Sequence, residues 1–123
     1  MGIEMKNENA VVCKSRDYAV RIIKLYKYLC EEKKEYVLSK QLLRSGTSIG
    51  ANVREAQRAQ STADFISKMN IALKEASETE YWLDLLQATD YLTAEQYQSI
   101  STDNDELVAL LVSIIKSAKK NEN

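Results

Sequence analysis

The sequence predicts an all-α protein that folds as an antiparallel up-down-up-down four-helix bundle. Its 123 residues include no proline and only three glycines, whereas Leu, Ala, Lys, Glu and Gln, which lose little side-chain entropy in a helix, are plentiful. Apolar residues recur at alternating four- and three-residue steps in helix-length segments, which is the spacing of a helical core seam. Short connections between such segments favour antiparallel neighbours within one domain.

The first expected helix spans residues 15–32. Ser15 suits the N-cap position because its hydroxyl can accept a hydrogen bond from a backbone amide, and Asp17 lies where the helix dipole favours an anion. The apolar face of this helix is Ala19, Ile22, Ile23, Tyr26, Leu29 and Cys30. A charged connector at residues 31–35 follows it, and residues 1–12 are expected to form a disordered tail.

The second expected helix, residues 36–60, has three different faces. The core seam repeats at helical spacing and comprises Leu38, Leu42, Ser45, Ile49, Asn52, Ala56 and Ala59. A flanking face, which is mostly small and could let another backbone come close, comprises Ser39, Leu43, Gly46, Gly50, Val53 and Gln57. The outer face carries four cations, Lys40, Arg44, Arg54 and Arg58.

Residues 45–50 are the weak point of this helix, because glycines and hydroxyl side chains there lower the helix propensity. A loop at this point is the alternative. The core spacing continues without interruption on both sides, which favours one continuous helix.

Two further helices follow, each with a capping signal. Ser61 with Asp64 resembles a capping box in acidic form, and it opens a helix that ends near Tyr91. Its seam is Phe65, Met69, Ala72, Ala76, Thr79, Leu83 and Leu86. Thr93 with Gln96 forms the next capping box, for a helix that ends near Ala118. The seam of this last helix is Tyr97, Ile100, Asn104, Leu107, Leu111, Ile114 and Ala118, and residues 121–123 are expected to be a disordered tail.

Charge and hydropathy limit the class of partner and the compartment. The net charge is −1 and the pI is about 5.6, so nucleic-acid binding requires a local basic patch. The start of the chain has no apolar stretch typical of a secretory signal. The longest apolar run, residues 107–112, is far shorter than the roughly 20 residues of a membrane span. Cys13 and Cys30 lie about 25 Å apart on a helix, too far for a disulfide. We expect a cytoplasmic protein with no membrane contact.

The residue types argue against catalysis and against a bound metal or cofactor. The sequence has no histidine, which excludes a Ser-His-Asp or Cys-His arrangement, the Glu-x-x-His pattern of di-iron bundles and a haem histidine. Glu75 and Glu78 lie one helical turn apart, but surface or interface glutamates are far commoner than a catalytic pair. Residues 46–50 lack the Gly-Lys-Ser/Thr ending of a P-loop. The sequence predicts no catalytic residue, no metal, no cofactor and no enzyme.

A second apolar stripe on the third helix suggests an oligomer interface. It lies about 120° from the core seam and comprises Ile71, Glu75, Glu78, Trp82 and Leu85. Large aromatic residues with apolar neighbours often anchor interfaces. We hypothesise homo-oligomerisation through this stripe and the small face of the second helix at Gly46 and Gly50. In the alternative, Trp82 only closes the edge of the core.

The cations Lys40, Arg44, Arg54 and Arg58 form the candidate RNA-binding stripe. They span about 27 Å at ~1.5 Å per residue and could bind a phosphate backbone by counterion release. The alternative is a solvated face, or pairing between subunits with Glu75 and Glu78. No aromatic residue interleaves the stripe, so it offers no base stacking.

Residues 42–56, which read Leu-Leu-Arg-Ser-Gly-Thr-Ser-Ile-Gly-Ala-Asn-Val-Arg-Glu-Ala, resemble a family signature. The family comprises four-helix bundle proteins encoded in intervening sequences of bacterial 23S ribosomal RNA genes, often labelled ribosomal proteins. Asp64-Phe65 with residues 71–76 and 78–83 is similar to its third helix. The resemblance covers residues 14–119 and implies a ring-like homopentamer. It supplies no catalytic residue. Asn52 and Glu55 match signature positions, and we expect Asn52 to fix helix register by hydrogen bonds.

A related branch of this family is the accessory protein of diversity-generating retroelements, which is a pentameric bundle that binds RNA and a reverse transcriptase. That branch is strongly basic, whereas this chain is mildly acidic. The predicted function is therefore a non-catalytic, self-assembling, RNA-associated helical bundle. The alternatives are a protein-interaction scaffold that binds no nucleic acid, or an accessory protein of a reverse-transcriptase system.

Overall fold

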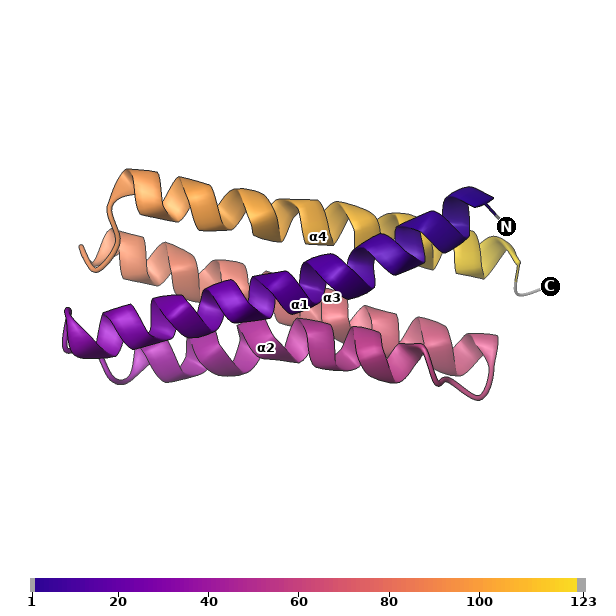
Figure 1. Ribbon diagram of the computed structural model, residues 1–123, viewed down its shortest axis with the longest axis horizontal. Coiled ribbons are helices and arrows are strands. Elements are labelled where there is room, and N and C mark those ends of the chain that lie inside the picture. Colours follow the sequence, from indigo (N-terminus) through magenta and orange to yellow (C-terminus); the bar gives the residue numbers. More distant parts are fainter. Residues whose placement is uncertain (1, 122–123) are drawn as a thin grey trace.

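Four long helices run alternately up and down beside one another (Figure 1). This computed structural model describes the backbone of residues 2–121 and the side chains of residues 7–121. Each helix contacts the next along the chain, and α4 also contacts α1, so the four surround one shared core. The antiparallel four-helix bundle predicted from the sequence is confirmed. The helices are α1 (Gly2–Glu31), α2 (Leu38–Ala56), α3 (Thr62–Ala88) and α4 (Ala94–Lys120).

The start of α1 differs from the prediction. The helix begins at Gly2, so neither a cap at Ser15 nor a disordered tail over residues 2–12 is correct. Ser15 is buried inside the helix, where its hydroxyl donates to the carbonyl oxygen of Val12 at 3.2 Å. Val11 is fully buried in the core. Because this part of α1 lies along α4 (Figure 1), tertiary burial stabilises helix that local sequence alone would not.

The other predicted tail lies at the C-terminus. Asn121 follows α4 directly as its C-cap, with its backbone amide bonded to the carbonyl oxygen of Ser117 at 3.2 Å. Met1 and residues 122–123, to which the tail predictions also apply, lie outside the described residues.

The helix α2 is continuous through residues 45–50, so the loop alternative is wrong. The hydroxyl groups there bond to carbonyl oxygens of the preceding turn and leave the helix intact. Thr47 Oγ1 donates to the carbonyl oxygen of Leu43 at 2.7 Å, and Ser48 Oγ donates to that of Arg44 at 2.6 Å. Such side-chain bonds satisfy the hydroxyls without breaking the backbone ladder.

Both ends of α2 lie inside the predicted limits. At the C-terminal end, the amides of Gln57, Arg58 and Ala59 each bond to the carbonyl three residues earlier. Such bonds tighten the last turn into 3₁₀ geometry and end the helix at Ala56 rather than Gln60.

The N-terminal end of α2 is held by a residue that precedes it. Glu35 is only 7% exposed, and its carboxylate accepts hydrogen bonds from the amides of Val37, Leu38 and Ser39 at 3.3, 2.8 and 2.8 Å. A carboxylate on free amides at a helix start is stabilised by both the hydrogen bonds and the helix dipole. The cap was not predicted, because Glu35 falls in the charged segment expected to be a connector at residues 31–35.

The capping signals of the last two helices are confirmed. Ser61 Oγ accepts a hydrogen bond from the Asp64 amide at 3.0 Å, although the Asp64 carboxylate bonds to the Gln60 amide instead of the Ser61 amide. Thr93 and Gln96 form the full reciprocal capping box. Thr93 Oγ1 accepts a hydrogen bond from the Gln96 amide at 3.1 Å, and Gln96 Oε1 accepts one from the Thr93 amide at 2.9 Å.

The core follows most of the predicted seam positions. Ile23, which was predicted on the apolar face of the first helix, is instead 39% exposed, and the seam of α3 is shifted at its start. Ile66 is buried there, whereas Phe65, the predicted seam residue, is half-buried. Asn104 of α4 is 1% exposed and donates to the carbonyl oxygen of Ala76 of α3 at 3.0 Å. The fully buried large side chains of the core are Val11, Ile22, Leu29, Leu42, Ile49, Val53, Met69, Leu83, Leu86, Leu107 and Leu111.

Within the described residues, none of the helices has an apolar stretch long enough to cross a lipid bilayer. Over the same part of the chain, the Cys, Asp and Glu side chains form no cluster that could hold a metal ion.

Candidate nucleic-acid interface on α2 and α3

The predicted cationic stripe lies on the outside of the bundle. The buried side of α2 packs against α1 and α3, which leaves Lys40, Arg44, Arg54 and Arg58 exposed on the opposite side. Arg58 lies in the turn after the helix rather than on its last turn. Among the described residues, Lys40, Arg54 and Arg58 form no ion pair. Three of the four predicted cations are therefore available to an external anion.

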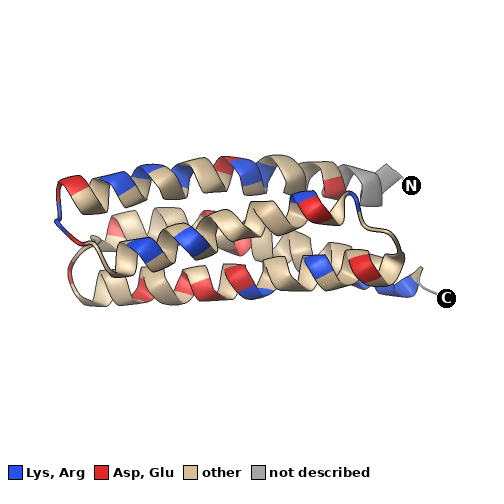
Figure 2. Cartoon of the chain, turned by 90° about the horizontal axis from the view of Figure 1, so that it is seen from below, with Lys and Arg blue, Asp and Glu red and all other residues tan. Residues whose placement is uncertain are grey.

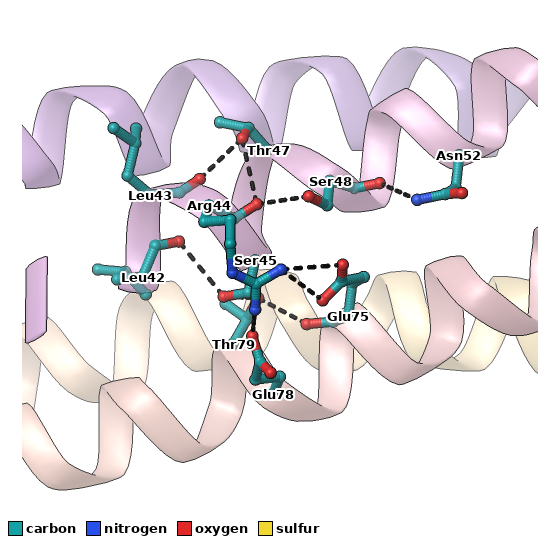
Figure 3. A network of polar contacts seen from close by, with 10 residues as sticks. All are labelled: Leu42, Leu43, Arg44, Ser45, Thr47, Ser48, Asn52, Glu75, Glu78 and Thr79. Carbon is teal, nitrogen blue, oxygen red and sulfur yellow. Dashed lines mark hydrogen bonds and ion pairs between the residues drawn. The ribbon is translucent and has the colours of Figure 1, made fainter. Parts of the chain in front are cut away.

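Arg44 differs from the other three because it is paired within its own chain (Figure 3). Its guanidinium lies 3.2 Å from the Glu75 carboxylate and also contacts the Glu78 carboxylate. The side chains of Arg44, Glu75 and Glu78 are 48%, 19% and 37% exposed, respectively. A stripe cation therefore does pair with Glu75 and Glu78, but within one chain, between α2 and α3, and not between subunits. This pairing partly neutralises the middle of the stripe.

Beside this ion-pair cluster, a buried polar contact joins the same two helices (Figure 3). Thr79 Oγ1 donates to the carbonyl oxygen of Glu75 at 2.8 Å and lies 3.0 Å from Ser45 Oγ. Thr79 and Ser45 are both fully buried. The backbone that carries Glu75 is therefore fixed relative to α2, which holds the carboxylate beside Arg44.

The role expected for Asn52 is corrected. Its side chain is half-buried, and Nδ2 donates to the carbonyl oxygen of Ser48 in its own helix at 2.9 Å. That bond crosses to no other helix. The polar side chain that does bridge two helices in the core is Asn104, through its bond to Ala76.

The small face of α2 is covered by α1 of the same chain, which corrects its assignment to an oligomer interface. Gly46 and Gly50 are both buried. A Cβ atom at Gly46 would lie 2.8 Å from Ile22 side-chain atoms, and one at Gly50 would lie 3.2 Å from the carbonyl oxygen of Ser15. These glycines allow the close approach of α1 and α2 and offer no surface to a second chain.

The stripe on α3 remains partly open. Ile71 is 40% exposed, and Leu85 is half-buried. Trp82 is half-buried and packs against the core, and its ring centroid lies 5.2 Å from that of the neighbouring Tyr81, which is 55% exposed. Trp82 therefore packs at the edge of the core, while its aromatic neighbour remains accessible.

Charge is divided between the two sides of the bundle. Cations outnumber anions by six to four in α1 and by three to one in α2. Anions outnumber cations by five to two in α3 and by four to three in α4. Figure 2 shows Lys and Arg gathered over α1 and α2, with Asp and Glu more frequent along α3. A chain with a net charge near zero thus has a basic side and an acidic side.

The chain is similar to proteins of one known family. The model of the 23S rRNA-intervening sequence protein family matches residues 7–113. The chain belongs to this family. A crystal structure of a protein with unknown function from the S23 ribosomal protein family of Bacteroides thetaiotaomicron VPI-5482 is similar at 64% sequence identity and a TM-score of 0.89. That match covers 89% of this chain and 98% of the other. No curated protein matches the chain.

In this member of the 23S rRNA-intervening sequence protein family, polar contacts that were not predicted from the sequence join α1 and α4. Arg21 bonds to the Asp103 carboxylate at 2.6 Å and to Ser99. Beside it, Tyr18 donates to the carbonyl oxygen of Ile100 at 3.3 Å. Burial is the main cause that raises the pKa of Tyr18, and the carboxylate of Glu80 adds to it. Neither contact lies near the stripe, so we assign both to stability.

Proposed function

We propose that the protein is a non-catalytic, self-assembling bundle that binds the RNA backbone through α2. The observation that carries this proposal is the exposure of Lys40 and Arg54 on the outer side of one uninterrupted helix and of Arg58 in the turn after it, with no ion pair among the described residues. The absence of histidine from the sequence supports a non-catalytic role.

The distribution of charge fits binding to phosphates. Lys40 and Arg54 are about 21 Å apart at ~1.5 Å per residue, so one RNA segment can contact both ends of α2. Each cation that neutralises a phosphate releases condensed counterions, which makes such binding strongly dependent on salt. The excess of cations over α1 and α2 attracts the same polyanion over a wider area.

Self-assembly is supported by the opposite charges of the two sides. The basic side formed by α1 and α2 lies across the bundle from the acidic side formed by α3 and α4. Copies that pack head-to-tail would bring unlike sides together, and heterologous contacts of this kind form a ring where the rotation between successive copies closes. The family resemblance implies a homopentamer. Light scattering at micromolar concentration tests this part of the proposal, and a 14.0 kDa monomer would contradict it.

The RNA part is tested by filter binding to a structured RNA at low and physiological salt. We expect the double variant Arg54→Glu/Arg58→Glu to weaken binding and to flatten its dependence on salt. Lys116→Glu/Lys119→Glu on α4 makes the same change in charge on exposed positions of another helix and should have a smaller effect. No affinity of the wild-type protein for any RNA at low salt would refute this role.

A second candidate is a protein-interaction scaffold, which would include an accessory protein of a reverse-transcriptase system. The observation that favours it is the exposure of large apolar side chains, with Tyr36, Val37 and Tyr81 at 52%, 74% and 55%. It predicts a protein partner, such as a reverse transcriptase encoded beside the gene, that stays bound after nuclease treatment. Substitution of Tyr81 by Ser should weaken that complex without changing RNA binding.

A further inference from the structure

A cavity of about 430 Å³ opens at one end of the bundle. It lies where the N-terminal part of α1, the connection from α2 to α3 and the C-terminal end of α4 meet. Small-molecule sites in proteins typically measure about 300–1,000 Å³, so this cavity is large enough for a ligand of the size of a nucleobase. The residues that decide its chemistry are Glu8, Gln57, Gln60, Phe65 and Ile114.

The lining suits a flat, uncharged ring that both donates and accepts hydrogen bonds. Phe65 and Ile114 supply apolar surface, and the amide side chains of Gln57 and Gln60 supply donors and acceptors. Among the described lining residues there is no Lys or Arg. The Glu8 carboxylate forms no hydrogen bond or ion pair with any described residue. A phosphate or carboxylate ligand would find no counter-charge among these described lining residues, whereas a base would find an aromatic ring and polar edges.

The cavity borders the proposed phosphate-binding residues. Arg58 lies in the chain between Gln57 and Ala59, which both line the cavity. Arg58 itself is exposed, and so is Arg54 one turn earlier in α2. Arg58 forms no ion pair with a described residue, so it is free to hold the phosphate of a nucleotide whose base enters the cavity.

From this juxtaposition we propose that the cavity receives one unpaired base of an RNA loop or single strand, stacked on Phe65, with its phosphate on Arg58. The inference rests on the proposed RNA binding and deepens it. Proteins read unpaired RNA by stacking bases on aromatic side chains and by hydrogen bonds to base edges. The cationic stripe itself offers no base stacking, because no aromatic residue lies within it. Phe65, from the start of α3, supplies an aromatic ring at the end of the stripe that carries Arg58.

Glu8 makes the site selective among bases. An ionised carboxylate only accepts hydrogen bonds, so it favours a base with an exocyclic amino group. Cytosine, adenine and guanine each present such a group and uracil presents none. The site therefore binds cytosine, adenine or guanine in preference to uracil.

The test measures binding of short single-stranded oligonucleotides of C, A or U to the full-length protein. For the C and A oligonucleotides, Phe65→Leu should weaken binding by about fivefold to a hundredfold, which is the range that loss of one stacked base produces. The dependence on salt should stay unchanged, because no phosphate contact is lost. Tyr36→Leu removes an exposed aromatic side chain at the opposite end of α2 and should leave binding unchanged. Circular dichroism checks that each variant is folded.

A second variant tests selectivity without removing the aromatic ring. The amide of Glu8→Gln both donates and accepts, so this variant should lose the preference for C and A over U. Two outcomes would refute the base site: Phe65→Leu binds as tightly as the wild type, or the wild type prefers U. If the oligonucleotides still bind with a normal dependence on salt in either case, the proposed RNA binding stands. If no RNA or oligonucleotide binds at low salt, the proposed function fails, and the base site fails with it.

Discussion

Gly46 of α2 lies against Ile22 of α1 so closely that the two helices leave no room for a methyl group between them. A Cβ atom at Gly46 would lie 2.8 Å from both γ carbons of Ile22. Those atoms are one bond from the Ile22 Cβ, so they cannot move far without moving the helix. The residue pair thus determines how near α1 approaches α2.

Gly46→Ala should therefore destabilise the protein. Alanine gains about 1 kcal/mol in helix propensity over glycine, but overpacking a core costs about 1–3 kcal/mol. Because the contact is with the stiff part of Ile22, we expect the overpacking to dominate and the free energy of unfolding to fall by up to about 2 kcal/mol. Urea unfolding measures this change.

Two comparisons make that prediction specific. The double variant Gly46→Ala/Ile22→Ala should be less destabilised than the sum of the two single variants, because the second substitution removes the clashing atoms. Gly50→Ala, whose Cβ would lie 3.2 Å from the carbonyl oxygen of Ser15, should cost less than Gly46→Ala. A Gly46→Ala variant more stable than the wild type would contradict the close packing.

The helices and their inner faces were predictable because they depend on local spacing. Met69, Ala72, Ala76 and Leu83 are all fully buried, as the seam of α3 requires. The capping box at Thr93 was equally predictable, since its two partners are three residues apart in the sequence.

The candidate sites were less predictable because they depend on which helix covers which face. The small residues at Gly46 and Gly50 indicated a close approach, but the sequence could not show that α1 makes it. Arg44 meets Glu75 and Glu78 only once α2 and α3 have packed in one particular register. A shift of one residue buries Ile66 and leaves Phe65 at the cavity, and helical periodicity does not resolve such a shift.

Glu35 should be a strong determinant of stability, although it lies outside the helices. Glu35→Ala leaves the amides of Leu38 and Ser39 without an acceptor, and loss of a helix cap with its charge costs about 1–3 kcal/mol. Glu35→Gln keeps one acceptor oxygen and should cost less. Thermal unfolding measures both variants, with the exposed neighbour Glu32→Ala as the control. Equal melting temperatures for Glu35→Ala and Glu32→Ala would show that the cap is unimportant.

Tyr18 should make the protein less stable at high pH. The residue is 3% exposed, and burial raises the pKa of its phenol above the usual value of 10.0. The unfolded chain therefore releases this proton near pH 10 while the folded chain retains it. The stabilisation from this group is complete below pH 10 and is lost as the pH rises further, by about 1.4 kcal/mol per pH unit.

The measurement is urea unfolding of wild type and Tyr18→Phe between pH 8 and pH 11. The variant lacks the hydrogen bond to the carbonyl oxygen of Ile100, so it should be about 1 kcal/mol less stable at pH 8. Its stability should then decline more slowly above pH 10. The exposed Tyr36→Phe is the control. Parallel curves for Tyr18→Phe and wild type would exclude this origin of the decline.

Glu75 and Glu78 should limit RNA binding by holding Arg44. An anion that uses Arg44 must compete with two carboxylates already in contact with it. In Glu75→Gln/Glu78→Gln the guanidinium faces only neutral amides, and it becomes available for one further phosphate. RNA affinity should rise, and the slope of log affinity against log salt should steepen by about 0.7–0.9, the contribution of one phosphate contact.

The matched control is Asp84→Asn/Asp90→Asn, which makes the same change in net charge at two exposed acids on and just after α3. Neither acid forms an ion pair in the described part of the chain, so this substitution releases no cation. It should raise affinity slightly through the overall field and leave the slope unchanged. If both double variants steepen the slope equally, the gain comes from net charge alone and not from the release of Arg44. A steeper slope only in Glu75→Gln/Glu78→Gln would identify Arg44 as a fourth phosphate ligand, because the slope counts phosphates neutralised.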